Sequence, residues 1–330
     1  MPELTKARVL AIAHECGFEL AGIAAAKPAA DFTRFEAWRA AGFAGEMGYL
    51  TDRRGDLRSD PRHLLASAKT VLCVGKLYNT ERPYSTEMDL AGRGWISRYA
   101  WGEDYHGLMR DRLEKVLDVL RAEASEPFEA RACVDTAPLL ERSYARLAGL
   151  GWIGKNTCLI NQDRGSWFFL GELLLSLDLE ADAPPPDRCG TCTRCIDACP
   201  TAAIVPDGEG GFTIDARHCI SYWTIEKRGP FDDAERAGIG AHIFGCDICQ
   251  DVCPWNREAP VTGEAAFAAR WFAPQLTDLG GMTEENFRER FRGSAVLRAK
   301  HAGFLRNVAA AQTNGGTGSL TPPDRASSAD

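Results

Sequence analysis

Eight cysteines in the second half of the chain are the residues best suited to chemistry. The chain has 12 cysteines, and eight of them fall between Cys189 and Cys253. They form two runs, Cys189-x2-Cys192-x2-Cys195-x3-Cys199-Pro200 and Cys246-x2-Cys249-x3-Cys253-Pro254, with Cys219 standing 27 positions before Cys246. A cubane iron–sulfur cluster needs four soft thiolates, and such tight spacings let one loop supply three of them. The spacing therefore predicts two 4Fe–4S clusters.

The two runs also predict which cysteines share a cluster. In two-cluster ferredoxins the cysteine before the proline ligates the other cluster. We therefore expect Cys189, Cys192, Cys195 and Cys253 at the first cluster, and Cys199, Cys219, Cys246 and Cys249 at the second. Two structural zinc sites and disulfides are the alternatives. Cys16, Cys73, Cys133 and Cys158 lie in apolar or strand contexts, and we interpret each as a small buried hydrophobe.

The elements that must position these cysteines begin with an α/β region over residues 1–180. Hydrophobic periodicity predicts helices over 4–16, about 104–124 and 137–151, the last with Thr136 at its cap and Pro138 in its first turn. Strands are predicted over 20–26, 69–78, 128–135, 157–160 and 166–179. Their order in a sheet cannot be read from the sequence.

Composition shifts divide the rest of the chain. The proline-rich stretch ADAPPP (181–186) is a stiff boundary. It opens a two-cluster module over 181–262, and 263–310 shows helical patterns without strands. Residues 311–330 are rich in Gly, Ser, Thr and Pro and are expected to be disordered.

Composition and charge exclude several classes of protein. The 330 residues are 45% hydrophobic and 25% charged, which excludes wholesale disorder and fibrous proteins. The net charge of −8 gives no overall positive field for a polyanion. One basic run stands out at 288–306, with six Arg or Lys against one Glu; a solvated helix face is the alternative interpretation. We see no signal peptide or membrane span, so we expect a cytoplasmic protein whose clustered cysteines bind metal.

No nucleotide-binding motif accompanies the cysteines. Neither GxGxxG after a strand nor GxxxxGK[ST] occurs. The segment DYHGLM (104–109) partly matches the Asp-x-His-x-x-Gly signature of cobalamin proteins, but Met109 replaces the glycine. A cobalamin would have to bind without that histidine, and we interpret His106 as an ordinary helix-start residue.

Four longer segments resemble the epoxyqueuosine reductase family. They are SRYAWGEDYH (97–106), LLERSYARLAGLGWIGKNT (139–157), CISYWTIEKRG (219–229) and GCDICQDVCPWN (245–256). The resemblance extends from the first helix to about residue 310. It implies a nitroreductase-like, cobalamin-binding α/β domain, a ferredoxin-like two-cluster module and a short HEAT-like helical segment. The implied activity is an oxidoreductase that reduces epoxyqueuosine to queuosine at the tRNA wobble position.

The resemblance also implies cofactors and partners. These are base-off cob(II)alamin, two 4Fe–4S clusters, tRNA with a GUN anticodon and an external donor of the flavodoxin or ferredoxin type. A monomer without membrane contact is expected. The family is similar to cobalamin-dependent reductive dehalogenases, which are one alternative, although the chain lacks their usual twin-arginine signal. A ferredoxin-type electron carrier is the other, but it leaves the α/β region without a role.

The resemblance makes Asp135, within CVDTAPLLER, the proton donor. Converting an epoxide to an alkene expels its oxygen as water, and a positioned acid avoids a free alkoxide. A carboxylate after a strand also lies where open α/β sheets place ligands, although helix capping is an alternative role. The expected cobalamin contacts are Arg58, Arg142, Lys155, Asn156, Gly165, Ser166, Ser221 and Tyr222. Surface ion pairs are the alternative for the two arginines, and plain turns for the loop with Lys155 and Asn156 and the turn at Gly165 and Ser166.

Overall fold

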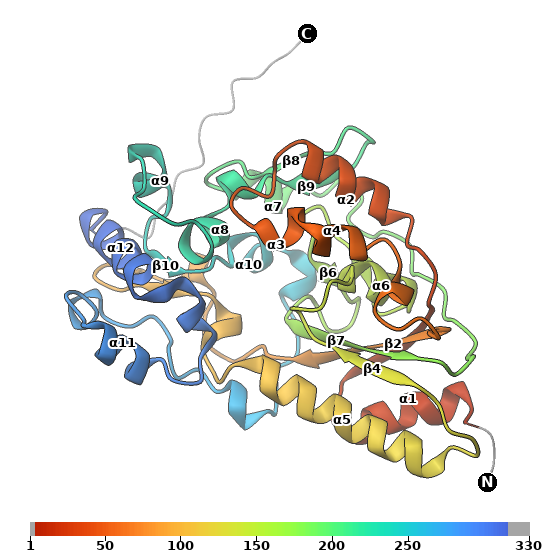
Figure 1. Ribbon diagram of the computed structural model, residues 1–330. Helices are drawn as coiled ribbons and strands as arrows, with labels where there is room; N and C mark the ends of the chain where they lie inside the picture. Colours follow the sequence, from red (N-terminus) through yellow and green to blue (C-terminus); the bar gives the residue numbers. More distant parts are fainter. Residues whose placement is uncertain (1–3, 316–330) are drawn as a thin grey trace.

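The computed structural model describes residues 4–315, which form a mixed α/β protein with cysteine-bearing loops along one side (Figure 1). The α-helices are α1 (Lys6–Glu15), α2 (Asp31–Ala40), α3 (Gly48–Thr51), α4 (Arg53–Leu57), α5 (Tyr105–Glu123), α6 (Glu141–Leu147), α7 (Arg194–Asp197), α8 (Ile220–Ile225), α9 (Asp233–Gly238), α10 (Ile248–Asp251), α11 (Glu284–Arg290) and α12 (Lys300–Thr313). Within the described part, no helix is both long and apolar enough to cross a membrane.

The strands are short except for two. They are β1 (Leu20–Ala25), β2 (Thr70–Leu77), β3 (Trp95–Ile96), β4 (Ala130–Cys133), β5 (Trp152–Ile153), β6 (Leu159–Ile160), β7 (Phe168–Leu175), β8 (Ile204–Pro206), β9 (Phe212–Ile214) and β10 (His242–Phe244). The main sheet has the order β1-β2-β7-β4, and every neighbouring pair in it is antiparallel. Open α/β sheets place ligands at the carboxyl ends of parallel strands. Because this sheet is antiparallel, that argument for a ligand next to Asp135 does not apply.

Helices cover both faces of this sheet, as Figure 1 shows. On one face α1 and α5 bury their apolar stripes against side chains such as Leu72, Val74 and Leu173. On the other face α6 packs Tyr144 and Ala145 against the sheet. Strand β2 is buried along all of its length, which explains why its sequence is almost continuously apolar.

Helix α5 follows the predicted periodicity closely. The Asp104 side chain caps it by accepting a hydrogen bond from the His106 amide, and the buried side chains recur at helical spacing. Those buried residues are Met109, Leu113, Val116, Leu117 and Leu120. The helix is thus fixed in position by its own apolar stripe.

The predicted start of the next helix is wrong. Helix α6 begins at Glu141, so Thr136 and Pro138 lie in the preceding loop. Asp135 has a φ of 48°, a left-handed conformation that turns the chain away from a helical path. Its amide donates a hydrogen bond to Glu141 Oε1 at 2.6 Å, which closes the loop before the helix can begin.

The two halves of the chain share a second core. Strand β3 pairs in parallel with β10, and the pairing brings Trp95 beside His242. Around it pack aromatic side chains of the C-terminal helices, including Phe287 and Phe304. The segment 90–101 therefore belongs to the same hydrophobic cluster as residues more than 100 positions later.

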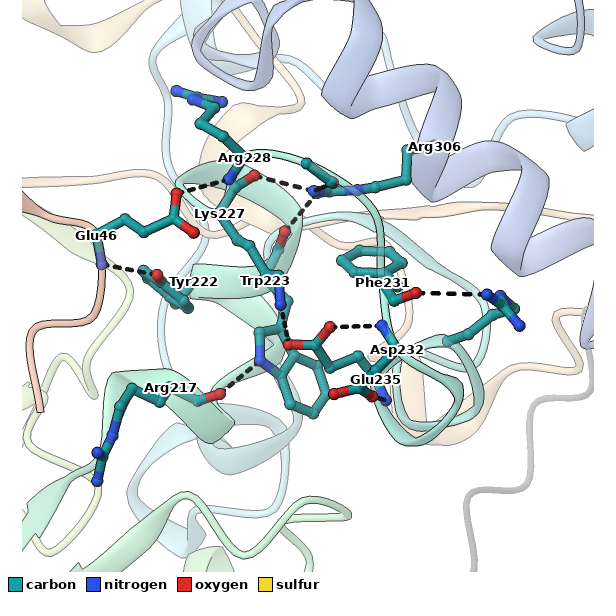
Figure 2. Close-up of polar contacts among 12 residues, drawn as sticks. Glu46, Arg217, Tyr222, Trp223, Lys227, Arg228, Phe231, Asp232, Glu235 and Arg306 are labelled. Carbon is teal, nitrogen blue, oxygen red and sulfur yellow. Dashed lines mark hydrogen bonds and ion pairs between the residues drawn. The ribbon is translucent and has the colours of Figure 1, made fainter.

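Helix α12 is tied to α8 by one arginine (Figure 2). The Arg306 guanidinium donates to the carbonyls of Trp223, Lys227 and Gly229, and its Cζ lies 3.9 Å from the centre of the Phe231 ring. Because α12 continues to Thr313, the expected disorder from residue 311 is wrong for its first residues. The rest of that prediction, 316–330, lies outside the described residues.

Candidate functional site

Four cysteines line one cavity of about 340 Å³. They are Cys189, Cys192, Cys195 and Cys253, the set expected at the first cluster. Cys195 lies in α7, and Cys253 caps the short turn over Pro254–Asn256. Burial, followed by the charges of Cys253, Cys189 and Cys192, raises the pKa of Cys195 to about 12. Four mutually repelling thiolates around one cavity are the donor set that a cationic iron–sulfur core neutralises.

The other four cysteines gather beneath α8 and α10. Burial, followed by the charge of Cys219, raises the pKa of Cys246 well above its usual value, and Cys199 adds to the effect. The contact with Cys158 and burial, followed by the charges of Cys158, Cys246 and Cys219, raise the pKa of Cys249 well above its usual value. Cys219 is the residue that precedes α8, so the helix start brings this isolated cysteine to the run at 246–249. Cys199, Cys219, Cys246 and Cys249 therefore lie close enough for their charges to affect one another.

All twelve cysteines, which lie within the described residues, are free thiols. Cys73 and Cys133 are buried in the sheet, as their apolar context predicted. Cys158 differs from that prediction, because its side chain contacts Cys249. It is a fifth thiol at the second set, which no spacing rule indicated.

A buried aspartate anchors the second cysteine run to the α/β region. Asp247, between two of the cysteines, accepts hydrogen bonds from Ser97 Oγ at 2.5 Å, from the Arg98 amide at 2.8 Å and from Trp95 Nε1 at 3.0 Å. Burial raises the pKa of Asp247, and these three hydrogen bonds oppose that effect. The β3 segment therefore fixes the position of the loop over 246–249.

Lys155 and Asn156 lie at the first cysteine cavity and help to line it. Lys155 Nζ donates to the carbonyls of Gly190 and Cys192 at 2.8 and 3.0 Å, and Asn156 donates to the Cys249 carbonyl at 3.2 Å. The structure therefore places both residues against the cysteine loops. As cobalamin contacts they stay a prediction.

Gly165 and Ser166 form a turn that packs against the second cysteine run, at Gln250 and Asn256. Gly165 has a φ of 68°, and a Cβ there would come within 2.3 Å of Asn256 Oδ1. The Ser166 amide donates to that same oxygen at 2.7 Å, and its hydroxyl donates to Gln250 at 2.9 Å. Only glycine permits this close approach of the turn to the cysteine module.

Arg58 and Arg142 are held by main-chain carbonyls. Arg58 is buried and donates to the carbonyls of Tyr49 and Arg54, and burial lowers the pKa of its guanidinium. Arg142 is exposed and donates to the Thr157 carbonyl at 2.5 Å. Neither arginine is in a surface ion pair with a carboxylate among the described residues, so that alternative is wrong.

Ser221 and Tyr222 lie on α8, directly after Cys219. The Tyr222 hydroxyl accepts a hydrogen bond from the Glu46 amide at 2.8 Å, which Figure 2 shows. A Cβ on the neighbouring Gly45 would collide with that hydroxyl. Tyr222 therefore joins the N-terminal region to the second cysteine set.

Asp135 and His106 form a pair at the surface between β4 and α5. His106 Nε2 lies 3.1 Å from Asp135 Oδ2, and its Nδ1 lies 2.6 Å from Asp104 Oδ1. Hydrogen bonds to Asp104 and then Asp135 raise the pKa of His106 to about 9, so the imidazole is protonated at neutral pH. His106 lies in the first turn of α5, as predicted, and its ring joins Asp104 to Asp135. In the sequence, the segment DYHG, which contains His106, was the signal that could have indicated a role for this histidine.

Two glutamates behind Asp135 escaped the sequence analysis. Glu141 accepts a hydrogen bond from the Asp135 amide. Its carboxyl group also interacts with that of Glu172, which lies in the middle of β7. Glu172 is fully buried. Burial, followed by the charge of Asp135, raises the pKa of Glu141 to about 7, and burial raises that of Glu172 well above its usual value. A charge inside the apolar run at 166–179 was the signal that could have found Glu172.

The basic run at 288–306 is only partly available to a ligand. Arg306 serves the carbonyls described above, and Arg298 pairs with Glu226. Arg288 pairs with Glu284 one turn earlier in α11. Arg292 and Lys300 are exposed. Arg290 donates a hydrogen bond to the Asp278 carbonyl, so we expect phosphate contacts from this run at Arg292 and Lys300.

Comparison with known proteins defines the class. Residues 188–256 match the family described as 4Fe-4S double cluster binding domain. Together with the two four-cysteine sets, this match makes the protein an iron–sulfur oxidoreductase, and the zinc and disulfide alternatives are wrong. Residues 58–136, which hold His106 and Asp135, match the family described as epoxyqueuosine reductase QueG, DUF1730.

Relatives and solved structures also indicate the epoxyqueuosine reductase family. The epoxyqueuosine reductase of Xanthomonas campestris is 44% identical over 313 residues, covering 93% of this chain and 86% of the relative. That of Escherichia coli is 40% identical, covering 91% and 78%. The structure of the Streptococcus thermophilus enzyme is 31% identical, with a TM-score of 0.79 over 94% of this chain and 81% of its own. The chain belongs to the epoxyqueuosine reductase family, which confirms the resemblance.

A further solved structure carries nucleic acid. It is an epoxyqueuosine reductase crystallised with an epoxyqueuosine-modified tRNA-Tyr stem loop. It is 28% identical to this chain, with a TM-score of 0.82 and coverage of 94% and 81%.

Proposed function

We propose that this enzyme reduces epoxyqueuosine to queuosine at the wobble position of tRNA, the last step of queuosine synthesis, with Asp135 as the proton donor. Family membership supports the reaction, and the stem loop bound by the related enzyme supports the substrate. The observation that carries the role of Asp135 is its hydrogen bond to a protonated histidine, on a protein with two four-cysteine sets.

The reaction needs two electrons and two protons, because the epoxide oxygen leaves as water. Asp135 protonates that oxygen as the carbon–oxygen bonds break. His106 then stabilises the carboxylate that remains, because its protonated ring donates a hydrogen bond to Asp135, and the second proton reaches Asp135 from water. A Bacillus subtilis relative has been solved with its aspartate catalytic loop swung out of the active site. Movement of the loop over 134–140 fits the positive φ of Asp135.

The surroundings of Asp135 fit a cobalamin that has no histidine ligand. Both ring nitrogens of His106 are engaged, by Asp104 and by Asp135, so neither is free to coordinate cobalt. A base-off cobalamin supplies a strongly reducing metal centre when bound. We propose that the eight residues predicted as its contacts hold it, among them exposed Arg142 and Ser221 on α8.

Electrons enter through the two clusters. We assign Cys189, Cys192, Cys195 and Cys253 to the first and Cys199, Cys219, Cys246 and Cys249 to the second. The shared cavity of the first set and the mutual effects within the second support this division. An external flavodoxin- or ferredoxin-type protein is the proposed donor.

Architecture and setting complete the proposal. The α/β domain (1–180) is nitroreductase-like, the cluster module (181–262) is ferredoxin-like and the helical segment (263–310) is HEAT-like. Antiparallel β2 and β7 at the centre of the sheet, the cysteine loops, and α11 packed on α12 support these three parts. The enzyme acts as a cytoplasmic monomer on tRNA with GUN anticodons.

The test uses anaerobically purified enzyme with reconstituted clusters and cobalamin. Incubation with a low-potential reductant and an epoxyqueuosine-containing stem loop should remove one oxygen atom from the modified base, as read by mass spectrometry. Enzyme without cobalamin is the control. Turnover of a halogenated phenol without action on the stem loop would instead indicate a dehalogenase. Iron content without corrin uptake would indicate an electron carrier.

A further inference from the structure

The buried carboxyl pair behind Asp135 has no role in the proposed reaction. Glu172 points from the central strand β7 toward α6, and its register partners are Cys73 on β2 and Cys133 on β4. The side chain is fully buried, and among residues 4–315 neither of its carboxyl oxygens makes a hydrogen bond of good geometry. An isolated carboxylate in such a place is strongly disfavoured, so Glu172 is neutral and carries a proton.

The contact of Glu172 with Glu141 gives that proton a use. The two carboxyl groups face each other, and Glu141 is the first residue of α6. A neutral carboxylic acid can donate its O–H to a neighbouring carboxylate. A neutral Glu172 can therefore direct its proton toward the carboxyl group of Glu141.

Glu141 in turn holds the backbone of Asp135. Its Oε1 accepts the Asp135 amide at 2.6 Å, and Asp135 has a left-handed backbone that costs energy for a residue with a side chain. The same conformation directs the Asp135 carboxylate to His106. The chain of contacts thus extends from the core of the sheet to the proposed proton donor.

We propose that Glu141 is the positioning residue of Asp135, and that neutral Glu172 keeps Glu141 in place. This inference rests on the proposed function of Asp135. It assigns a role to a carboxyl pair that the reaction does not consume. Loss of the pair leaves the acid on the chain but allows its loop to leave the position that faces His106.

The strength of this contact depends on pH. A charged Glu141 accepts the Asp135 amide more strongly than a neutral one. Because the pKa of Glu141 is raised to about 7, the contact strengthens as pH rises through that value. The charged and titratable groups that surround the pair are Asp135 in its loop, Arg142 on α6, Arg58 after α4, Cys73 on β2, Cys133 on β4 and Tyr105 on α5.

Hydrogen exchange of the holoenzyme, measured by mass spectrometry, tests the contact without any substrate. Peptides over 134–141 should lose protection in Glu141→Ala, by about tenfold or more for a bond to a charged acceptor. Glu172→Leu should lose part of it, since leucine suits the apolar site but donates nothing. Glu172→Gln should retain it, because its amide still donates. Exposed Glu114 on α5 provides the matched control, Glu114→Ala.

The pH series and the kinetics complete the test. Protection, corrected for intrinsic exchange, should rise through about pH 7 in the wild type and stay flat in Glu141→Gln. In Glu141→Ala, kcat for reduction of the stem loop should fall, and KM should stay unchanged. Wild-type protection in Glu141→Ala would overturn the role of Glu141, and equal protection in the Gln and Leu variants would overturn that of Glu172. A wild type that shows the protection pattern but never reduces the stem loop would contradict only the proposed function.

Discussion

His106 and Asp135 lie 29 positions apart in the sequence and share a hydrogen bond of 3.1 Å between Nε2 and Oδ2. Asp104 holds the other ring nitrogen at 2.6 Å. One imidazole therefore joins the start of α5 to the loop after β4. The arrangement places a protonated histidine beside the proposed proton donor.

The first prediction concerns the pH range in which this pair persists. Because the folded-state pKa of His106 is raised to about 9, its charged interaction is fully present below about 6.5 and is lost as pH rises through about 9. We expect kcat of the wild type to fall across that upper range. In His106→Gln this alkaline decline should be absent and kcat lower throughout. An unchanged alkaline limb in the variant would show that another group titrates.

The second prediction concerns acid catalysis. Asp135→Asn keeps the size of the side chain but removes the transferable proton. We expect turnover of the stem loop to fall by ~10²-fold or more, with iron content and cobalamin binding unchanged. Single-turnover kinetics measure the effect. Near-wild-type rates would exclude Asp135 as the donor.

The third prediction concerns Cys219. This cysteine lies outside both runs but within the second set, so Cys219→Ala should lower iron from about eight to about four atoms per chain. Iron analysis and EPR of the reconstituted protein distinguish the clusters. Cys16→Ala, at the end of α1 and remote from both sets, is the control and should keep all of the iron. Full iron content in Cys219→Ala would contradict the ligand assignment.

The fourth prediction concerns the contribution of Arg306 to the stability of the C-terminal segment. Arg306→Ala removes the hydrogen bonds to three carbonyls and the contact with Phe231, which should cost roughly 2–4 kcal/mol of stability. Thermal melting of the holoenzyme measures the loss. Arg288→Ala, which breaks one exposed ion pair, should change stability by less than about 1 kcal/mol. Equal melting temperatures for the two variants would contradict the anchoring role.

The fifth prediction concerns tRNA binding by the exposed part of the basic run. Arg292→Gln together with Lys300→Gln should weaken stem-loop binding and flatten its log–log salt dependence by roughly 0.7–0.9 per lost phosphate contact. Titrations at several salt concentrations give the slope. Arg298→Gln should leave the slope near that of the wild type, because that side chain pairs with Glu226. Identical slopes in wild type and double variant would place the tRNA elsewhere.

Local patterns predicted much of this protein. The periodic apolar residues of α5 and the continuous apolar run of β2 were sufficient, because a single buried face determines each element. Cysteine spacing predicted the double-cluster module for a similar reason, since its loops are short. The sheet order could not be predicted, because β2 meets β7 through pairings of residues about 100 positions apart.

The candidate site depends on contacts that no local pattern reports. Thr136 and Pro138 have the composition of a helix start, yet the left-handed Asp135 and its bond to Glu141 delay α6. His106 lies two residues after Asp104, which binds its ring, but its contact with the distant Asp135 could not be predicted from this local context. Long-range geometry, rather than residue type, therefore defines the acid site.

The pairing of β3 with β10 has a consequence for synthesis in the cell. The hydrogen bond from Trp95 Nε1 to Asp247 cannot form until Asp247 is translated, 152 positions later, and α12 is translated later still. At ~5–20 residues per second that delay is roughly 10–30 s. Throughout it, the apolar segment around Trp95 and Trp101 lacks the partners that bury it in the folded protein. The first cysteine cavity is likewise incomplete until Cys253 has been translated, 58 positions after Cys195.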